Sequence, residues 1–235
     1  MLGFNDIAKK KTHLAYLEDK DIFSHTADAF VSKKIVKGYL FFLKNIICFN
    51  LEKTNNCIDL GCGAANITNE FLKKGFNIKG LEYSDDAMNM LKRNNPQLNL
   101  VQGDMTKFKE DNSYNFIFSR EVYLITRVNS YLEQHKIVSN IIDSLKSGGI
   151  FMLVGSDVNY PQCMDYDLII KNFRKDHRIK FVSDKYYEIL ITKFHQYIFG
   201  KISYKICELL FLPLIWYKKR YQMWASQYII VFEKK

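Results

Sequence analysis

One short stretch combines residues that could bind a charged ligand. "IDLGCGAAN" (residues 58–66) places Asp59 directly before Gly61 and Gly63. Glycines allow a tight turn and let a ligand approach the backbone, and a helix beginning just behind the turn would favour an anion. Asp59 is itself an anion and would repel a phosphate unless something neutralises it. The turn therefore fits a ligand that carries a positive charge near Asp59.

A dinucleotide would use the same kind of turn, but three features argue against it. The sixth position of the G-x-G-x-x-G/A fingerprint falls on Asn66. Asp59 would lie near a pyrophosphate, and a further acid, Asp104, follows the next strand but one. A dinucleotide needs neither acid.

A ligand with a cationic amino-acid tail, a ribose and an adenine accounts for the acids. Asp59 can face the ammonium, and Glu82, at the end of "IKGLE", can accept both ribose hydroxyls. Asp104 can accept the adenine amino group while Met105 packs on the ring. S-adenosylmethionine has these three parts, so we predict it as the cofactor.

The segments that must position these residues alternate between strand and helix patterns. Apolar strands are predicted in "CIDL", "NIKGLE", "LNLVQ", "YNFIFSR" and "IFMLVG", and helices in "ANITNEFLKKG", "AMNMLKRNN" and "QHKIVSNIIDSLKSGG". This alternation predicts an α/β fold with a doubly wound, mostly parallel sheet. Ligands of such sheets bind beyond the carboxyl ends of the strands, which is where the acids stand.

We predict that residues 1–235 form one domain, because 48% of them are hydrophobic and can build a full core. Residues 1–50 form an N-terminal helical cap, and residues 51–156 form the cofactor-binding core. Residues 157–226 are too long for a connection and are predicted as an aromatic and basic helical lid. Residues 227–235 form the final strand.

The sequence resembles the class I S-adenosylmethionine-dependent methyltransferases in "IDLGCGAAN", in the acid that closes "IKGLE", and in "VQGDM", "YNFIFSREVY" and "LKSGGIFMLV". The resemblance covers about residues 50–155 and the last strand. It implies a Rossmann-like methyltransferase fold with a seven-stranded sheet, and methyl transfer by in-line displacement, with S-adenosylhomocysteine as product. The positions that it implies for cofactor binding are Asp59, Gly61, Cys62, Gly63, Glu82, Tyr83, Asp104, Met105 and Ser119.

The chain also departs from the family pattern. Asn115 stands where an acid commonly begins the fourth strand, and "YLIT" stands where many small-molecule enzymes have a histidine. "SREV" replaces the "DPPY" or "NPPF" sequence that many enzymes methylating amino groups of nucleic acids and proteins use. These departures argue against base N-methylation.

Three residues are candidates for catalysis at the acceptor. Arg120 could bind an anionic acceptor and Glu121 could take a proton. His25, in the N-terminal segment, is a third candidate as a base. A surface salt bridge or an exposed histidine is the alternative interpretation of each. Sulfonium methyl transfer needs mainly alignment, so a dedicated base is not required.

The net charge of +9 is concentrated near the C-terminus, where residues 156–235 carry 14 Lys and Arg minus 8 Asp and Glu, or +6. This field favours anionic partners.

The five cysteines form no C-x-x-C pair, so we expect no metal site and a reducing, cytoplasmic location. The N-terminus is too polar for a signal peptide, and no run is long enough to span a membrane.

We expect O-methylation of a small anionic metabolite, such as a phosphorylated or nucleotide-linked sugar. An RNA methyltransferase is the second hypothesis, based on the +9 charge, although no nucleic-acid motif accompanies it. The third is a non-enzymatic binding or membrane-surface module that uses residues 195–224. "ICELLFLPLIWYKKRYQMW" in that segment could lie on a bilayer, cover the acceptor or form a homodimer contact, or simply pack onto the sheet.

Overall fold

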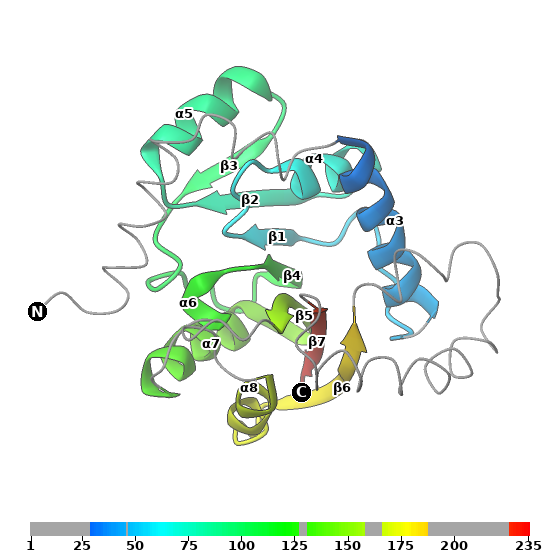
Figure 1. Cartoon of the computed structure of the whole chain (residues 1–235), viewed down its shortest axis with the longest axis vertical. Helices are drawn as coiled ribbons and strands as arrows, with labels where there is room; N and C mark the ends of the chain where they lie inside the picture. Colours follow the sequence, from blue (N-terminus) through cyan, green and yellow to red (C-terminus); the bar gives the residue numbers. More distant parts are fainter. Residues whose placement is uncertain (1–28, 46, 127–130, 158–165, 188–225) are drawn as a thin grey trace, which may run out of the picture.

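The computed structural model describes five stretches of the chain: residues 29–45, 47–126, 131–157, 166–187 and 226–235. They contain a seven-stranded sheet of order β3-β2-β1-β4-β5-β7-β6, which Figure 1 shows from β3 at the top to β6 at the bottom. Strands β3, β2, β1, β4 and β5 run parallel, and β7 is antiparallel to both of its neighbours. The predicted α/β fold with a mostly parallel sheet is confirmed.

The strands have clear bounds. They are β1 (Cys57–Leu60), β2 (Ile78–Glu82), β3 (Asn99–Gln102), β4 (Tyr114–Arg120), β5 (Leu145–Asp157), β6 (Ile179–Tyr187) and β7 (Ser226–Lys234). The described helices are α3 (Ala29–Asn45), α4 (Asn66–Lys73), α5 (Asp85–Asn94), α6 (Tyr123–Thr126), α7 (Tyr131–Ser144) and α8 (Tyr166–Phe173). Helix α3 agrees with the predicted N-terminal helix, and residues 1–28, including His25, lie outside the described residues.

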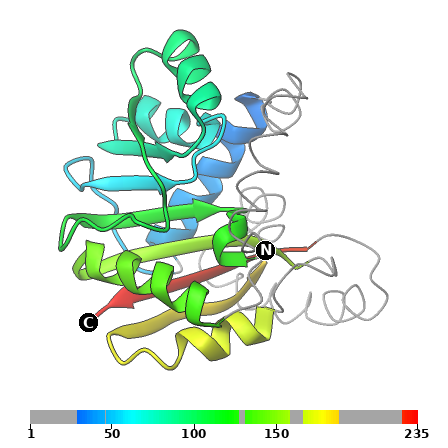
Figure 2. The same ribbon diagram turned by 90° about the vertical axis from the view of Figure 1, so that its left-hand side faces the viewer.

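The sheet is apolar on both faces, so helices must cover each of them. Along β5, Ile150 and Met152 join a core cluster on one face, and Phe151 and Leu153 join a cluster on the other. Helices α3 and α4 contribute to the first cluster, and α6, α7 and α8 to the second. Figure 2 accordingly shows α3 behind the sheet, with α7 and α8 in front of it. The doubly wound prediction is confirmed.

Two sequence predictions need correction. The helical lid predicted for residues 157–226 is wrong at residues 179–187, which form strand β6. Strand β7 has two backbone edges, and β5 covers one while β6 covers the other. The helix expected to run to Gly148 instead ends at Ser144, because Leu145 already pairs with Tyr114 of β4. Residues 188–225 lie outside the described residues.

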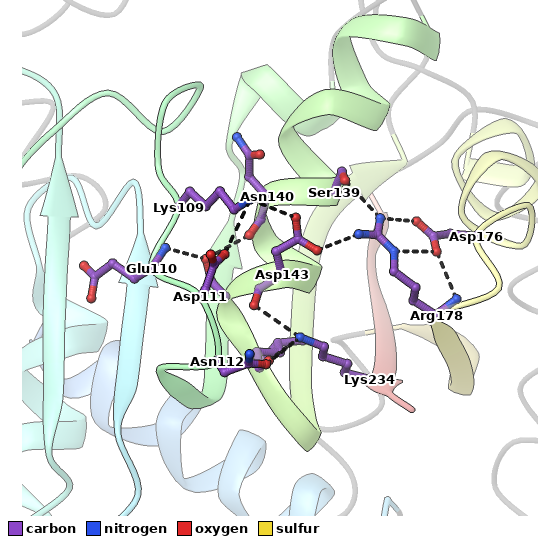
Figure 3. A network of polar contacts seen from close by, with 12 residues as sticks. Lys109, Glu110, Asp111, Asn112, Ser139, Asn140, Asp143, Asp176, Arg178 and Lys234 are labelled. Carbon is purple, nitrogen blue, oxygen red and sulfur yellow. Dashed lines mark hydrogen bonds and ion pairs between the residues drawn. The ribbon is translucent and has the colours of Figure 1, made fainter.

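The amino edge of the sheet, where the parallel strands begin, carries a polar network centred on Arg178 (Figure 3). The Arg178 guanidinium donates to Asp143 at 2.6 Å, to Ser139 at 2.9 Å and to both carboxylate oxygens of Asp176. The Lys234 ammonium donates to the Leu145 carbonyl at 2.7 Å. We call these residues the amino-edge network, and they connect the starts of β5 and β6 to the end of β7.

No helix within the described stretches is long and apolar enough to cross a membrane.

Candidate active site

The glycine turn (residues 61–65) joins β1 to α4 at the carboxyl edge of the sheet. Gly61 and Gly63 both have left-handed backbones, with φ of +71° and +53°. A Cβ atom on Gly61 would lie 2.7 Å from Cγ2 of Val122. The absence of a side chain at Gly61 therefore lets the turn after β4 lie directly against the glycine turn.

Cys62 does not present its thiol as a free ligand group. A Cβ atom on Gly80 of β2 would lie 2.8 Å from the Cys62 Sγ, so the thiol packs onto the bare backbone of that strand. Burial and the neighbouring acids Asp59 and Glu82 raise the pKa of Cys62 well above its usual value. Any contact of Cys62 with the cofactor through its backbone stays a prediction.

Glu82 is bound to the glycine turn through its carboxylate. One oxygen accepts from the Gly63 amide at 2.9 Å, and the other accepts from the amides of Tyr83 and Ser84 at 3.0 and 3.1 Å. The side chain is only 4% exposed. Burial raises the pKa of Glu82, while the three amides act in the opposite direction.

Asp59 lies beneath the glycine turn, and only 3% of its surface is exposed. Its Oδ2 atom accepts a 2.6 Å hydrogen bond from the Thr68 hydroxyl of α4. Burial raises the pKa of Asp59 to about 7; the Thr68 bond and the Arg120 charge lower it, and the Glu82 charge raises it. With so little exposure, Asp59 would act on a cationic ligand above the turn mainly through its electric field, which is strong at low dielectric.

Asp104 and Met105 follow β3, next to the end of β2. One Asp104 oxygen accepts from the amide and the hydroxyl of Thr106, at 2.9 and 2.7 Å, and so fixes the local turn. Met105 is 4% exposed and belongs to the core cluster that contains Leu60 and Leu81. Since its surface is nearly all buried, contact of Met105 with an adenine stays a prediction.

Tyr83 and Ser119 differ sharply in exposure. Tyr83 is 49% exposed directly after Glu82, which suits an aromatic ring that packs on a bound ligand. Ser119 is fully buried, and its hydroxyl donates to the Leu60 carbonyl at 3.2 Å. The Ser119 side chain thus joins β4 to the end of β1, and its contact with the cofactor stays a prediction.

Arg120 and Glu121 end β4 beside the glycine turn. Arg120 is close enough to Asp59 to lower the pKa of that acid. Glu121 has a left-handed backbone with φ of +55°, and its amide donates to the Val154 carbonyl of β5 at 2.8 Å. A non-glycine residue held in this region is uncommon and is often found at functional sites.

Three residues of this arrangement were missed in the sequence. Thr68 binds Asp59, Val122 contacts Gly61, and Gly80 receives the Cys62 thiol. Thr68 follows Asp59 by nine residues, so a hydroxyl one turn into the helix behind the strand was a usable signal. The contacts of Val122 with Gly61 and of Gly80 with Cys62 join residues that are distant in sequence, so no local pattern predicts them.

The chemistry of this site fits a cationic cofactor. Two buried carboxylates, Asp59 and Glu82, have raised pKa values without a ligand. A sulfonium with an ammonium tail would compensate their charge, whereas a pyrophosphate would add to it. That Glu82, Tyr83 and Asp104 hold its ribose and adenine stays a prediction.

Comparison with known proteins identifies the family. A family model described as a methyltransferase domain matches residues 51–220, more than half of the chain. The chain belongs to the methyltransferase domain family. It is a class I methyltransferase, and its cofactor is S-adenosylmethionine.

Curated relatives of this methyltransferase act on different acceptors, as their names state. Trans-aconitate 2-methyltransferase of Rhizobium rhizogenes is 28% identical over 107 residues, 44% of this chain and 39% of that protein. Malonyl-[acyl-carrier protein] O-methyltransferase 2 of Ilyobacter polytropus is 25% identical over 73% of this chain and 69% of that protein. Ribosomal RNA small subunit methyltransferase A of Campylobacter hominis is 27% identical over 63% of this chain and 48% of that protein. The matches span less than half the length of the first and third relatives.

A solved structure shares the fold of this methyltransferase over nearly its whole length. The TehB-like SAM-dependent methyltransferase from Corynebacterium glutamicum superposes with a TM-score of 0.60 at 11% identity, covering 96% of this chain and 100% of that one. The likeness establishes the fold, and the acceptor must be argued from the site.

Proposed function

We propose that this methyltransferase methylates an oxygen atom of a small anionic acceptor. The observation that carries the proposal is the turn after β4, where Val122 contacts Gly61 and Arg120 lies in the field of Asp59. Arg120 and Glu121 therefore lie beside the glycine turn. A guanidinium binds a carboxylate or phosphate through two parallel hydrogen bonds.

The two groups suit different parts of the reaction. Bound S-adenosylmethionine supplies an electrophilic methyl group, and the acceptor oxygen takes it as the carbon–sulfur bond breaks. Arg120 would orient an anionic acceptor for this displacement. Where the acceptor is a hydroxyl, Glu121 would receive its proton, and a carboxylate or phosphate oxygen needs no base.

Two relatives support this choice of acceptor. The names of the trans-aconitate and malonyl-[acyl-carrier protein] enzymes specify acceptors that carry carboxylates, and the second specifies O-methylation. The net charge of +9 also favours an anionic substrate. We therefore extend the expected acceptors from phosphorylated and nucleotide-linked sugars to small polycarboxylates.

The proposal can be tested with radiolabelled S-adenosylmethionine and a panel of polycarboxylates, sugar phosphates, nucleotide sugars, neutral sugars and amines. We expect transfer to an anionic member and an oxygen-linked product by NMR. Arg120→Met should raise KM for that acceptor about tenfold or more, which is the loss of one charge-assisted contact. Lys180→Met removes an exposed cation at the opposite edge and is the control. Transfer to amines alone would contradict the proposal.

RNA is a second candidate acceptor because one relative is a ribosomal RNA methyltransferase. "SREV" at residues 119–122 stands against it, since the sequence lacks the motif typical of enzymes that methylate base amino groups. RNA binding would weaken steeply with rising salt. Salt-dependent retention on RNA together with methyl transfer to RNA, and none to the small anions, would favour this candidate.

A further inference from the structure

The Thr68–Asp59 hydrogen bond is an unusual use of a helical threonine. Thr68 lies within α4 and is fully buried, and its hydroxyl donates to the Asp59 carboxylate of β1 at 2.6 Å. Thr126 of α6, which is also buried, donates its hydroxyl to the Val122 carbonyl four residues earlier at 3.0 Å. The Thr126 bond is the common local one within a helix. The Thr68 bond instead joins the helix behind the glycine turn to the buried acid beneath it.

Charged groups on the neighbouring strands act on Asp59. Glu82 of β2 disfavours its negative charge, and Arg120 of β4 favours it. The Cys62 thiol of the glycine turn has a pKa raised well above its usual value, so it stays neutral and adds no charge. From α4, Thr68 favours the charge by donating a hydrogen bond. A bond to the charged form of a buried acid is worth more than one between neutral groups.

We propose that Thr68 is a positioning residue of the cofactor site, whose hydroxyl keeps Asp59 oriented and negatively charged to oppose the cationic tail of S-adenosylmethionine. Without the hydroxyl, a carboxylate this deeply buried would take up a proton or lose its fixed orientation. A neutral Asp59 would exert no attraction on the ammonium. Thr68 thus acts on the cofactor only through Asp59, and the inference rests on the use of this cofactor, not on the identity of the acceptor.

The test is S-adenosylmethionine binding by calorimetry between pH 5.5 and pH 9, with no acceptor present. Thr68→Val keeps the shape of the side chain and removes the hydroxyl. We expect its affinity to fall about fivefold at pH 7 and about tenfold at pH 5.5, which corresponds to an Asp59 pKa higher by about one unit than its value of about 7. The difference should shrink at pH 9, where Asp59 loses its proton in both proteins. Thr68→Ser restores a hydroxyl and should return both the affinity and the pH profile.

Control variants separate this role from a merely structural one. Thr126→Val removes another buried threonine hydroxyl, which does not contact Asp59, and should leave the pH profile of binding unchanged. Asp59→Asn should bind weakly at every pH, with a flat profile. If Thr68→Val does not fold, Thr68→Ala removes the same hydroxyl with a better helix former.

Two outcomes would overturn the inference. A wild-type pH profile and affinity in Thr68→Val and Thr68→Ala, which both lack the hydroxyl, would show that the hydroxyl does not act on the cofactor. Wild-type binding by Asp59→Asn would show that Asp59 does not attract the cofactor, and the role of Thr68 would fall with it. Neither outcome depends on which acceptor is methylated.

Discussion

Buried carboxylates at the two edges of the sheet have pKa values shifted in opposite directions. At the carboxyl edge, Asp59 and Glu82 are almost fully buried, and their hydrogen bonds come from a hydroxyl and from backbone amides. At the amino edge, buried Asp176 is paired with the Arg178 guanidinium, which lowers the pKa of the acid. At the carboxyl edge, burial outweighs these hydrogen bonds and raises the pKa values of Asp59 and Glu82.

The difference separates a binding edge from a structural one. A buried acid whose charge is poorly compensated destabilises the folded protein, but it attracts a cationic ligand strongly. The amino-edge network compensates its own charges and needs no ligand. This protein therefore concentrates its electrostatic strain at the edge that is predicted to bind the cofactor, and such strain is a common cost of function.

The largest expected effect is the gain in stability from Asp59→Asn without cofactor. The folded-state pKa of about 7 lies above the ordinary value of 3.8. The acid's contribution to stability is therefore complete below about pH 4 and is lost as the pH rises through about 7. A shift of this size corresponds to about 4 kcal/mol. Asparagine avoids the loss, so urea unfolding at pH 8 should show a variant more stable by up to that amount.

The same comparison at pH 4 is the control for Asp59→Asn. Wild-type Asp59 is neutral there in the folded state, so the two proteins should unfold at similar urea concentrations. A variant that is less stable than the wild type at both pH values would contradict the assignment of strain to this edge.

Arg178→Met should have the next largest effect, in the opposite direction. Removal of the guanidinium leaves the buried Asp176 without its charge partner and should destabilise the protein by about 2 kcal/mol at pH 7. Because the pKa of Asp176 is lowered in the fold, the contribution of the pair is present at neutral pH and is lost as the pH falls below 3.8. Cofactor affinity should not change.

Lys180→Met is the matched control for Arg178→Met. Lys180 is 66% exposed and lies 3.9 Å from Glu233, and an exposed pair of this kind contributes little. Urea unfolding should therefore show almost no change. Equal losses in the two variants would mean that the amino-edge network does not act as a buried ion pair.

The smallest effect concerns backbone strain. Glu121 at the carboxyl edge and Asn112 at the amino edge both have positive φ, +55° and +49°. Asparagine adopts this region more readily than glutamate does, so Glu121→Gly should stabilise the protein by about 1 kcal/mol. Asn112→Gly should gain less stability, and it also loses the hydrogen bond that the Lys234 ammonium donates to the Asn112 side chain. Denaturant unfolding of both variants tests this, and a destabilised Glu121→Gly would refute strain at the binding edge.

Most of the fold could be predicted because each core strand has its own local pattern. Ile150 to Val154 alternate between the two core clusters, and an unbroken apolar run of this kind is typical of a central strand. Strand β6 was missed because residues 179–187 mix charged and aromatic side chains without a clean period. Their pairing with β7, which is far along the chain, decides their structure.

The site could be predicted in its acids and glycines but not in its supports. Each of the three acids, Asp59, Glu82 and Asp104, lies at or just beyond the end of a recognisable strand. The rule that ligands bind beyond the carboxyl ends of the strands therefore predicted that they share one edge of the sheet. The interior positions of Ser119 and Met105 depend on which side of a strand end faces the core. The residue types at these positions do not predict which way the side chain points.

By itself, the sequence determined the alternation of strands and helices, the glycine turn and the three acids that favour a cationic cofactor. Local propensity and side-chain chemistry are enough for these features, since each depends on neighbours in the chain. Only the tertiary structure decided that Asp59 is buried against Thr68, that Val122 contacts Gly61, and that the two edges differ in charge compensation. These properties arise from residues distant in sequence, and burial changes the free energy of a charge far more than residue type does.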